Sequence, residues 1–546
     1  MALGFRDYTF LGATQSLCPA CLRLVPAKIV ERGGRIYFRK RCPEHGPRED
    51  FVCSDARWWD RTDYSLPGKT PRRFGVEPAL GCPYDCGLCT DHEQHTCLGL
   101  LEITSACNLE CPLCFASSGP GGRHLSFDEC RSAIDRLVEA EGQPEVLQLS
   151  GGEPTVHPQL LDVWRYACDQ PIDVVMINTN GLRLAHDREL VEQLAERRHR
   201  TEIYLQLDGF SEGGCRTLRG QRLVETKLRA VERLGEAGLR TILVCTVQPG
   251  VNDGELGRLV EFGIERPWIT GVSFQPAAYV GRHVLPAELE RRVTFPDVIR
   301  AIGEQTGHGR NGRGRWRPTD FSPLPCAHPN AHTLAYAYRR GRQCVPLARF
   351  IDLENHLDLL AGRITFNRQR ARELIGQYLA RAACSTGACS AAPPSQQSLD
   401  SRRSTSGRSG NDSPAESTML SAPPRPLVER RLGAAHDQQD AAEESLAQEF
   451  FRRAILEDLG PEDVFRITTT SFMDAYNFDV RQEMKACVHF VLPSGHIVPF
   501  SAYNLLYRPG HAPLPPLANS AALDAIHEAP GRASSAFATR SAGHPS

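Results

Sequence analysis

From about residue 98, short apolar segments typical of β-strands alternate with longer amphipathic segments typical of helices. The clearest helix covers residues 126–141, where Ser126 and Glu129 have the spacing of a capping box. Because parallel strands need crossover connections, the alternation predicts a parallel sheet with outer helices. We expect an α/β fold with a partial (β/α)6 barrel over residues 99–282. The six predicted strands are Leu98–Thr104, Glu145–Leu149, Val174–Thr179, Glu202–Leu207, Thr241–Val247 and Gly271–Gln275.

Three closely spaced cysteines follow the first predicted strand. Cys107, Cys111 and Cys114 have the spacing C-x3-C-x2-C. Three thiolates hold three irons of a [4Fe–4S] cube and leave the fourth iron open, whereas electron-transfer clusters are usually closed by four cysteines. An open iron can chelate S-adenosylmethionine, and an electron from the cube can then release a 5′-deoxyadenosyl radical. The competing interpretation of so short a motif is half of a zinc site. We assign these three cysteines as catalytic cluster ligands.

A second motif argues against the zinc interpretation. It directly follows the second predicted strand and consists of Ser150, Gly151, Gly152, Glu153 and Pro154. Glycines at a strand end let the backbone approach a ligand, and Glu153 could accept a hydrogen bond from the ammonium of the methionyl group. The two motifs together resemble the radical SAM superfamily, whose members carry a GGE at this place for that purpose. We therefore expect residues 150–153 to bind S-adenosylmethionine.

Polar residues also follow the later predicted strands. In barrels of this kind, ligands bind at the carboxyl ends of the strands. An ordinary turn or cap is the alternative for each residue taken alone, but together they would meet at one barrel mouth. We expect them to contact the ribose, carboxylate or adenine of S-adenosylmethionine. The residues are Asn178, Asn180, Gln206, Asp208 and Gln275.

Length and charge exclude some classes of protein. A chain of 546 residues with 41% hydrophobic composition should bury more than one core. A net charge of −2 favours neither nucleic acid nor an anionic membrane as a partner. Because the chain has no run of 18 apolar residues and no signal-peptide pattern, we expect a cytoplasmic protein without a transmembrane segment.

The count of 20 cysteines favours metal sites over disulfides, because a reducing compartment keeps thiols free of disulfides. The first set has the pattern C-x2-C … C-x2-H, which suits a closed tetrahedral site for zinc or a rubredoxin-like iron. Cys53 is a rival to the histidine as fourth ligand. We expect a structural site in a small domain over residues 1–75. Its predicted ligands are Cys18, Cys21, Cys42 and His45.

A second set of cysteines precedes the first predicted strand, in residues 76–98. The spacing C-x3-C-x2-C-x7-C imitates the catalytic motif but adds a fourth thiolate, which could close an auxiliary [4Fe–4S] cluster that relays electrons. A zinc site that involves His92 or His95 is the alternative. The predicted cluster ligands are Cys82, Cys86, Cys89 and Cys97.

The rest of the chain divides by composition. Residues 283–390 keep apolar and helical segments and could cap the barrel or contact substrate. Residues 391–444 are rich in Ser, Pro, Arg and Gln and are expected to be a disordered insert. Residues 445–512 are expected to form a C-terminal α+β extension, and residues 513–546 a flexible tail.

The order of motifs along nearly the whole chain resembles the class D methyltransferases, a radical SAM family that includes tetraether lipid synthases and enzymes proposed to methylate pterins. The matching motifs are CPAC … CPEHG, GCPYDCGLCTDHEQHTC, PLPC-x-HP, VPLARFID, SFMDAYNFD and VPFSAYN. Two positions depart from the family pattern: Ala331 and Ser501 stand where members often carry cysteine. The resemblance implies that these positions complete a third cluster with Cys326 and Cys487. That cluster would have only two thiolates here, unless Cys344, Cys384 or Cys389 substitutes.

The resemblance also implies an activity. It points to formation of a C–C bond at an unactivated or ring carbon of a lipid or pterin substrate, by methylation or by coupling of two chains. It also implies a low-potential electron donor such as flavodoxin or ferredoxin. The alternatives are a radical SAM oxidoreductase or peptide-modifying enzyme, and a degenerate metal-binding scaffold without catalysis.

Overall fold

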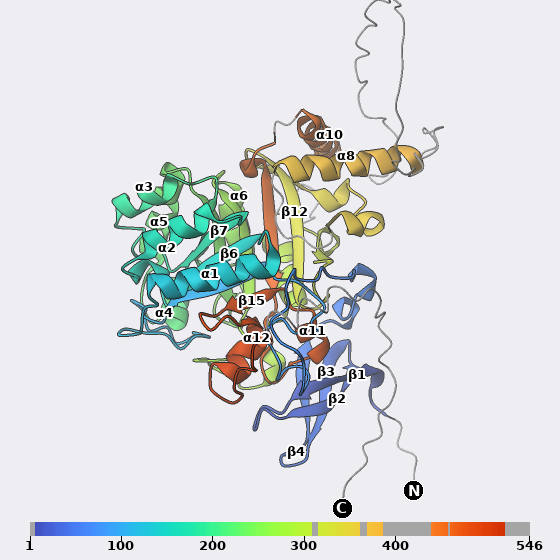
Figure 1. Cartoon of the computed structure of the whole chain (residues 1–546). Helices are drawn as coiled ribbons and strands as arrows, with labels where there is room; N and C mark the ends of the chain where they lie inside the picture. The colour runs from blue at the N-terminus through green and yellow to red at the C-terminus, as the bar shows by residue number, and fades with distance from the viewer. Residues whose placement is uncertain (1–5, 308–314, 361–367, 386–437, 457–458, 519–546) are drawn as a thin grey trace, which may run out of the picture.

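A computed structural model describes residues 6–307, 315–360, 368–385, 438–456 and 459–518 (Figure 1). The predicted insert at 391–444 lies outside the described residues up to 437. Its last residues do not behave as predicted, because residues 438–444 begin a helix, α10 (Gln438–Ile455). The predicted tail is described only to Ala518, whose backbone N–H donates to the carbonyl of Gly75 at 2.9 Å.

The N-terminal domain is a four-stranded antiparallel sheet. Its strands are β1 (Thr9–Leu17), β2 (Leu24–Arg32), β3 (Arg35–Cys42) and β4 (Gly46–Cys53), paired in the order β1-β2-β3-β4. Two tight connections, between β1 and β2 and between β3 and β4, lie at the same end of the sheet. These connections carry the first set of predicted metal ligands.

The predicted barrel strands are all present, with bounds that differ by at most two residues. They pair in parallel in the order β10-β9-β8-β7-β6-β5. Their cores are runs of apolar residues, as expected for strands that are covered on both faces. The strands are β5 (Leu98–Thr104), β6 (Val146–Gly151), β7 (Val174–Thr179), β8 (Thr201–Gln206), β9 (Arg240–Val247) and β10 (Ile269–Pro276).

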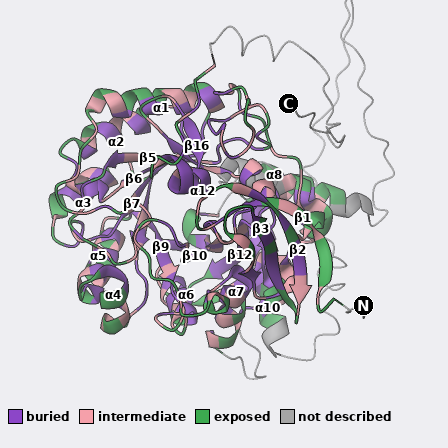
Figure 2. Ribbon diagram, turned by 90° about the horizontal axis from the view of Figure 1, so that it is seen from below, coloured by how far each residue is buried: buried purple, intermediate pink, exposed green. Residues whose placement is uncertain are grey.

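Helices cover the outer face of these strands, and Figure 2 shows their buried sides turned towards the sheet. The predicted capping box is confirmed: the backbone N–H of Glu129 donates to Ser126 Oγ at 3.2 Å, and the backbone N–H of Ser126 donates to Glu129 Oε2 at 2.8 Å. The main core lies between sheet and helices and includes fully buried Trp164. The helices are α1 (Phe127–Glu141), α2 (Leu160–Asp169), α3 (Arg188–Ala195), α4 (Glu212–Arg219), α5 (Val224–Glu236), α6 (Leu256–Ile264) and α7 (Phe295–Gln305).

The C-terminal region does not form a separate layer; its strands extend the barrel sheet at both edges. β14 (Val464–Thr470) pairs in parallel with β10, and β15 (Val488–Val491) pairs in parallel with β5. The edge strands of a partial barrel expose unpaired backbone groups, and this pairing satisfies them. The sheet is completed by antiparallel strands, which are β11 (Ser322–Pro323), β12 (His332–Arg340), β13 (Gln343–Pro346) and β16 (Ile497–Pro499).

The remaining elements are helical. α8 (Arg368–Ser385) and α10 lie together at the top of Figure 1, and Tyr378 and Phe451 from these two helices stack in a small apolar core. α11 (Val480–Met484) and α12 (Phe500–Ala502) lie below the barrel strands in Figure 1, and one π-helical turn (Tyr503–Tyr507, the π-turn) follows α12. Short 3-10 turns occupy Ala56–Trp58, Thr62–Tyr64, Pro154–Val156, Leu289–Arg291, Pro318–Asp320, Leu347–Arg349, Glu354–Leu360 and Pro461–Asp463.

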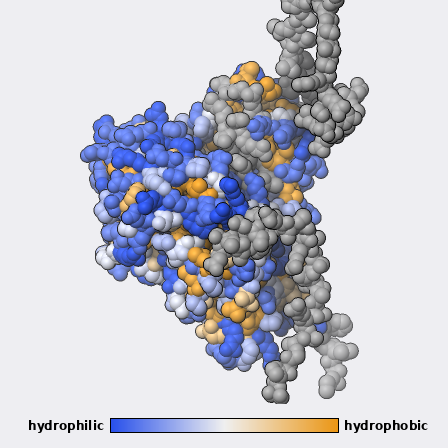
Figure 3. Space-filling view, in the orientation of Figure 1, coloured by the Kyte–Doolittle hydropathy of each residue, from blue (hydrophilic) through white to orange (hydrophobic). Residues whose placement is uncertain are grey.

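Within the part of the chain that the structure describes, every helix is too short or too polar to cross a membrane. The face in Figure 3 agrees with this, since the surface over the barrel helices is mainly hydrophilic and the hydrophobic patches are scattered.

Candidate functional site

The three cysteines of the C-x3-C-x2-C motif lie in a loop that leaves the end of β5. The segment after β10 holds this loop. The backbone N–H of Cys114 donates to the carbonyl of Arg282 at 2.9 Å, and the N–H of Arg282 donates back at 3.0 Å. The Arg282 guanidinium also donates from Nε to the carbonyl of Cys111 at 2.9 Å. Because these contacts engage only the loop backbone, the side chains of Cys107, Cys111 and Cys114 are left to line a cavity of about 150 Å³.

The same cavity brings together most of the residues predicted to bind S-adenosylmethionine. They come from the carboxyl ends of β6, β7, β8 and β10, as expected for a parallel sheet. Those that line the cavity are Gly151, Gly152, Glu153, Asn178, Asn180, Gln206 and Gln275. The other two lie behind this lining. Ser150 Oγ accepts a hydrogen bond from Asn178 Nδ2 at 3.1 Å, and Asp208 is buried against Arg219.

The two glycines let the end of β6 pack directly on the cysteine loop. Gly151 has φ +130°, and a Cβ there would lie 2.0 Å from the carbonyl oxygen of Thr104. A Cβ on Gly152 would lie 2.2 Å from the carbonyl oxygen of Ala106. The backbone N–H of Gly152 donates to Thr104 at 2.7 Å, and that of Glu153 donates to Ala106 at 2.9 Å. Glycine is required here for a close approach of two backbones.

Glu153 is buried, and its carboxylate already accepts four hydrogen bonds. Oε1 accepts from the N–H of Thr155 at 3.0 Å, from its hydroxyl at 2.6 Å and from the hydroxyl of Thr179 at 2.7 Å. Oε2 accepts from the N–H of Asn180 at 2.7 Å. Oε2 accepts this one hydrogen bond, so it can take a further donor. The contact with the ammonium of S-adenosylmethionine stays a prediction for this oxygen.

Two buried cations beside the cavity were missed by the sequence analysis. Arg219 donates from Nε to Asp208 Oδ2 at 2.7 Å and from Nη2 to Thr246 Oγ1 at 3.0 Å. Lys227 Nζ donates to the carbonyl of Gln206 at 2.6 Å. With 63 lysines and arginines in the chain, no spacing distinguishes these two; only their burial does.

The buried cation at Arg219 bears directly on the cysteine loop. Burial raises the pKa of Cys111, and the Arg219 charge opposes that rise. Burial raises the pKa of Cys107 to about 11. Thiolates at these positions therefore need a positive partner, and iron would supply one while Arg219 assists at Cys111.

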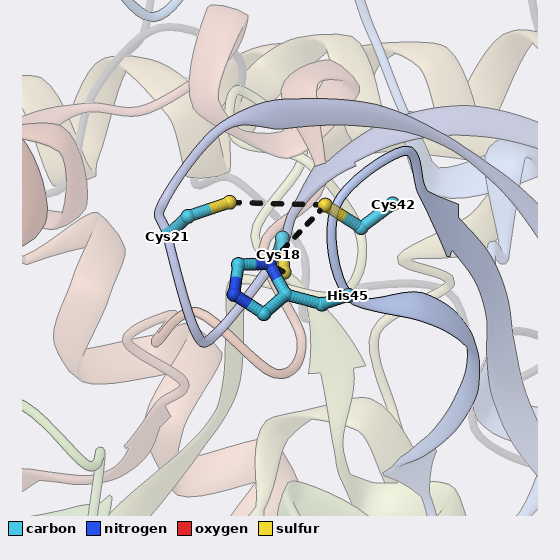
Figure 4. Close-up of side chains that lie close together, drawn as sticks. All are labelled: Cys18, Cys21, Cys42 and His45. Carbon is cyan, nitrogen blue, oxygen red and sulfur yellow. Dashed lines mark hydrogen bonds between the residues drawn. The ribbon is translucent and has the colours of Figure 1, made fainter.

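The N-terminal set is brought together as predicted (Figure 4). The ligand atoms of the four residues all lie within 4.8 Å of one another. The sulfurs of Cys21 and Cys42 are 3.8 Å apart, and His45 Nδ1 lies 3.5 Å from Cys42 Sγ and 3.7 Å from Cys18 Sγ. Zinc–sulfur bonds of about 2.3 Å in a tetrahedron give sulfur separations of about 3.8 Å. The geometry therefore fits a single metal ion.

Cys53 does not compete for this site. It is buried at the end of β4, in the core shared with the barrel side, and its thiol donates to the carbonyl of Asp55 at 3.6 Å. The hydrogen bond from His45 instead lowers the pKa of Cys42 to about 6, which favours the thiolate that a metal requires. An imidazole ligand suits zinc better than a rubredoxin-like iron.

The second set of cysteines is split by the structure. Cys82, Cys86 and Cys89 line one small cavity together with Glu483 of α11 and Pro499 of β16. The neighbouring Cys82 thiol and burial raise the pKa of Cys86, and the Glu483 charge adds to this effect.

Cys97 lies in a different group, and the structure does not bring it together with Cys82, Cys86 and Cys89. Its backbone N–H donates to the carbonyl of Cys487 at 3.0 Å, which places it at the junction of β5 and β15. Cys97, Cys326 and Cys487 pack in one buried cluster. His95 Nε2 lies 3.5 Å from Cys97 Sγ, and His332 Nε2 lies 3.7 Å from Cys487 Sγ. This group of three thiols and two imidazoles could hold a metal.

The two departures from the family pattern fall in different places. Ala331 packs in the buried cluster with Cys326 and Cys487, as expected. Ser501 does not: its neighbour Pro499 lines the cavity of Cys82, and the N–H of its neighbour Ala502 donates to Glu483. The structure therefore does not bring the two positions together in one third cluster.

Comparison with family models agrees with this geometry. Residues 101–263 match the radical SAM superfamily, and residues 10–54 match the HMPTM N-terminal zinc ribbon domain. The radical SAM match covers the three cysteines and the carboxyl ends of β5 to β9, whose donors fit the superfamily's cofactors. The chain therefore takes a [4Fe–4S] cluster and S-adenosylmethionine, and its N-terminal domain takes a metal ion.

Comparison with whole proteins extends the match beyond the barrel. The mycofactocin maturase MftC of Mycobacterium tuberculosis is 32% identical over 149 residues, which is 27% of this chain and 36% of that protein. The solved structure of Streptococcus suis SuiB bound to the precursor peptide SuiA matches with a TM-score of 0.33 and 18% identity, over 39% of this chain and 45% of that one. The 7,8-dihydro-6-hydroxymethylpterin dimethyltransferase of Methanocaldococcus jannaschii is 30% identical over 521 residues, which is 91% of this chain and 94% of that protein. The chain therefore belongs to the radical SAM superfamily and, within it, to the methyltransferase-like family of that dimethyltransferase.

Proposed function

We propose that this protein is a radical SAM methyltransferase that forms a C–C bond at a ring carbon of a reduced pterin. One observation carries the proposal. A single cavity joins the three cysteines, the polar ends of the barrel strands and an aromatic wall made of Phe115, Phe472 and Phe500. The full-length similarity to a pterin dimethyltransferase supports the same choice of substrate.

The polar side of the cavity suits S-adenosylmethionine. When bound, the cluster and S-adenosylmethionine supply a 5′-deoxyadenosyl radical, which abstracts hydrogen from the substrate. Glu153 Oε2 keeps one acceptor position for the ammonium, and the amides of Asn178 and Gln206 can bond the carboxylate or the ribose. Gln275 Nε2 donates to the hydroxyl of Tyr204 at 3.1 Å, which orients both side chains at the cavity edge.

The opposite side of the cavity suits a flat heterocycle. The rings of Phe472 and Phe500 stack with centroids 3.9 Å apart, and Phe115 packs on Phe500 at 5.1 Å. A pterin ring could stack on these faces while its polar edge points to the strand ends. A lipid chain would need a long apolar channel, whereas this cavity is lined by polar groups along the strand ends. These features favour a pterin over a lipid.

The other cysteine groups are proposed to serve electron transfer. Three cysteines at Cys82, Cys86 and Cys89 suit a second [4Fe–4S] cluster next to the catalytic loop, and a flavodoxin or ferredoxin is the proposed external donor. The cysteines that the structure describes form no disulfide, which suits a reducing compartment, and we propose the cytoplasm.

The direct test is turnover of the anaerobically reconstituted full chain with S-adenosylmethionine, a reductant and 7,8-dihydro-6-hydroxymethylpterin. The proposal predicts that the pterin gains one or two methyl masses and that 5′-deoxyadenosine forms with it. Carbon-13 in the S-adenosylmethionine methyl group or in a folate one-carbon donor identifies the carbon source. A pterin that stays unchanged while an ether lipid or a peptide is modified would contradict it.

A further inference from the structure

The cavity beside Cys82, Cys86 and Cys89 contains a carboxylate that no other feature of the fold explains. Glu483 lies in the last turn of α11 and is 1% exposed. Its Oε1 accepts a hydrogen bond from the backbone N–H of Ala502 at 2.8 Å. Its Oε2 is buried and has no hydrogen-bond partner among the described residues. A buried carboxylate oxygen without a partner is costly, so a ligand that contacts it is expected.

The other oxygen and nitrogen donors around this cavity are already engaged or exposed. Asp85 Oδ2 accepts from the backbone N–H groups of Ala79 at 2.7 Å and Gly81 at 2.6 Å, and also from Leu80. His92 Nε2 lies 2.9 Å from the carbonyl oxygen of Ala486 and 3.1 Å from His489 Nε2, so this nitrogen is already engaged.

Asp91 also lines the cavity, but it is exposed to solvent. Among the carboxylates that line this cavity in the described residues, Glu483 is the one with a buried oxygen that has no hydrogen-bond partner.

The protein holds both sides of this cavity firmly. The Tyr507 hydroxyl donates to the carbonyl of Pro83 at 2.8 Å and accepts from the N–H of Cys86 at 3.1 Å, so the π-turn fixes the cysteine loop. The N–H of Ala502 fixes Glu483 from the same C-terminal segment. One continuous segment therefore holds both Glu483, through Ala502, and the backbone at Pro83 and Cys86, through Tyr507.

We propose that Cys82, Cys86 and Cys89 bind three irons of the second [4Fe–4S] cluster and that the Glu483 carboxylate binds the fourth through Oε2. This rests on the second cluster put forward above. A non-thiolate ligand is compatible with such clusters, since histidines replace cysteines on one iron of Rieske centres. Because Cys97 belongs to another group, the carboxylate takes the place that the sequence pattern gave to a fourth thiolate.

The test uses the full chain with Cys107, Cys111 and Cys114 replaced by alanine, which removes the signal of the catalytic cluster. Into this parent we would introduce Glu483→Gln, which keeps an acceptor for the Ala502 N–H. Asp91→Asn is the matched control at an exposed carboxylate of the same cavity, and Ser501→Ala removes a nearby hydroxyl as a rival ligand. Iron and sulfide per chain, EPR spectra and circular dichroism are measured after anaerobic reconstitution and again after mild oxidation.

The proposal predicts that Glu483→Gln loses about one iron per cluster and converts to the [3Fe–4S] EPR signal, with unchanged circular dichroism. Glu483→Cys should restore the iron content, and both controls should match the parent. Parent-like iron and EPR spectra in Glu483→Gln would overturn the role of Glu483. Loss of iron only in Asp91→Asn or Ser501→Ala would assign the fourth iron to that residue instead, and would also overturn the role of Glu483. If the parent variant contains no cluster, the second cluster does not exist and the proposal fails. The pterin turnover assay tests the proposed function separately and does not depend on this outcome.

Discussion

Pro499 and Phe500 are neighbours in the chain, yet they line different cavities. Pro499 faces the group of Cys82, Cys86 and Cys89, and Phe500 faces the catalytic cavity beside Cys107. One short segment therefore separates the proposed second cluster from the radical site. The same C-terminal segment joins the barrel sheet through β15 and β16, and β16 ends at the first of the two residues that reach the two sites.

The aromatic wall should determine affinity for the substrate. Phe472→Leu keeps an apolar side chain but removes the stacking face next to Phe500. We expect the KM for the pterin to rise about 2- to 10-fold, because aromatic pairs contribute about 0.5–1.5 kcal/mol beyond burial. Steady-state kinetics at saturating S-adenosylmethionine measures this. An unchanged KM for the pterin would mean that the ring does not bind against this wall.

The ion pair behind the cavity should be needed for folding. Arg219→Ala leaves Asp208 buried without its partner, which should cost about 3–5 kcal/mol in the free energy of unfolding. The double variant Arg219→Met with Asp208→Asn should recover much of that loss. Burial raises the pKa of Asp208, but the Arg219 charge holds it below its ordinary value. The stability that this ion pair contributes is therefore present above about pH 4 and is lost as the pH falls further. A variant in which the pair contributes less should begin to unfold in acid at a higher pH than the wild type.

The N-terminal metal should stabilise its own domain. Cys18→Ala removes one ligand from a site whose metal-binding free energy is also folding free energy, of order 10 kcal/mol for zinc-finger peptides. Limited proteolysis should then cut residues 1–70 faster, while the barrel resists. His45→Cys keeps four ligands and is the matched control. Normal protease resistance of Cys18→Ala together with lost turnover would instead indicate a redox role.

Buried Lys40 should anchor that domain to the C-terminal segment. Its Nζ donates to the carbonyls of Leu17, Ala475 and Tyr476 at 3.0, 3.1 and 2.7 Å and pairs with Asp50 at 3.1 Å. Burial lowers the pKa of Lys40 to about 8. The unfolded chain then binds more protons between pH 8 and about 10.5, so the lysine's contribution to stability rises with pH in that window. Chemical denaturation of the wild type and Lys40→Met should show a difference that grows from pH 8 to pH 10, and a constant difference would contradict the assignment.

Features set by local sequence could be predicted. The barrel strands are apolar runs separated by amphipathic helices, and Ser126 with Glu129 marks a helix start that the structure confirms. The N-terminal metal site followed from spacing, because its four ligands lie in two tight connections of one small sheet.

Features set by distant contacts could not be predicted. Cys97 has the right spacing to join Cys89, but its backbone is paired to Cys487, far along the chain. The positions of β14 and β15 at opposite edges of the sheet depend on the same kind of pairing. Arg219 and Glu483 are typical helix residues in the sequence, and only burial singles them out.

The most direct test of the account is reductive cleavage of S-adenosylmethionine by the wild type and by the variant with Cys107, Cys111 and Cys114 replaced by alanine. The loop lies outside the barrel core, so the variant should keep its circular dichroism and its other metals. The account predicts 5′-deoxyadenosine from the reconstituted wild type, increased by the pterin substrate, and none from the variant. Equal 5′-deoxyadenosine formation by both proteins would contradict it.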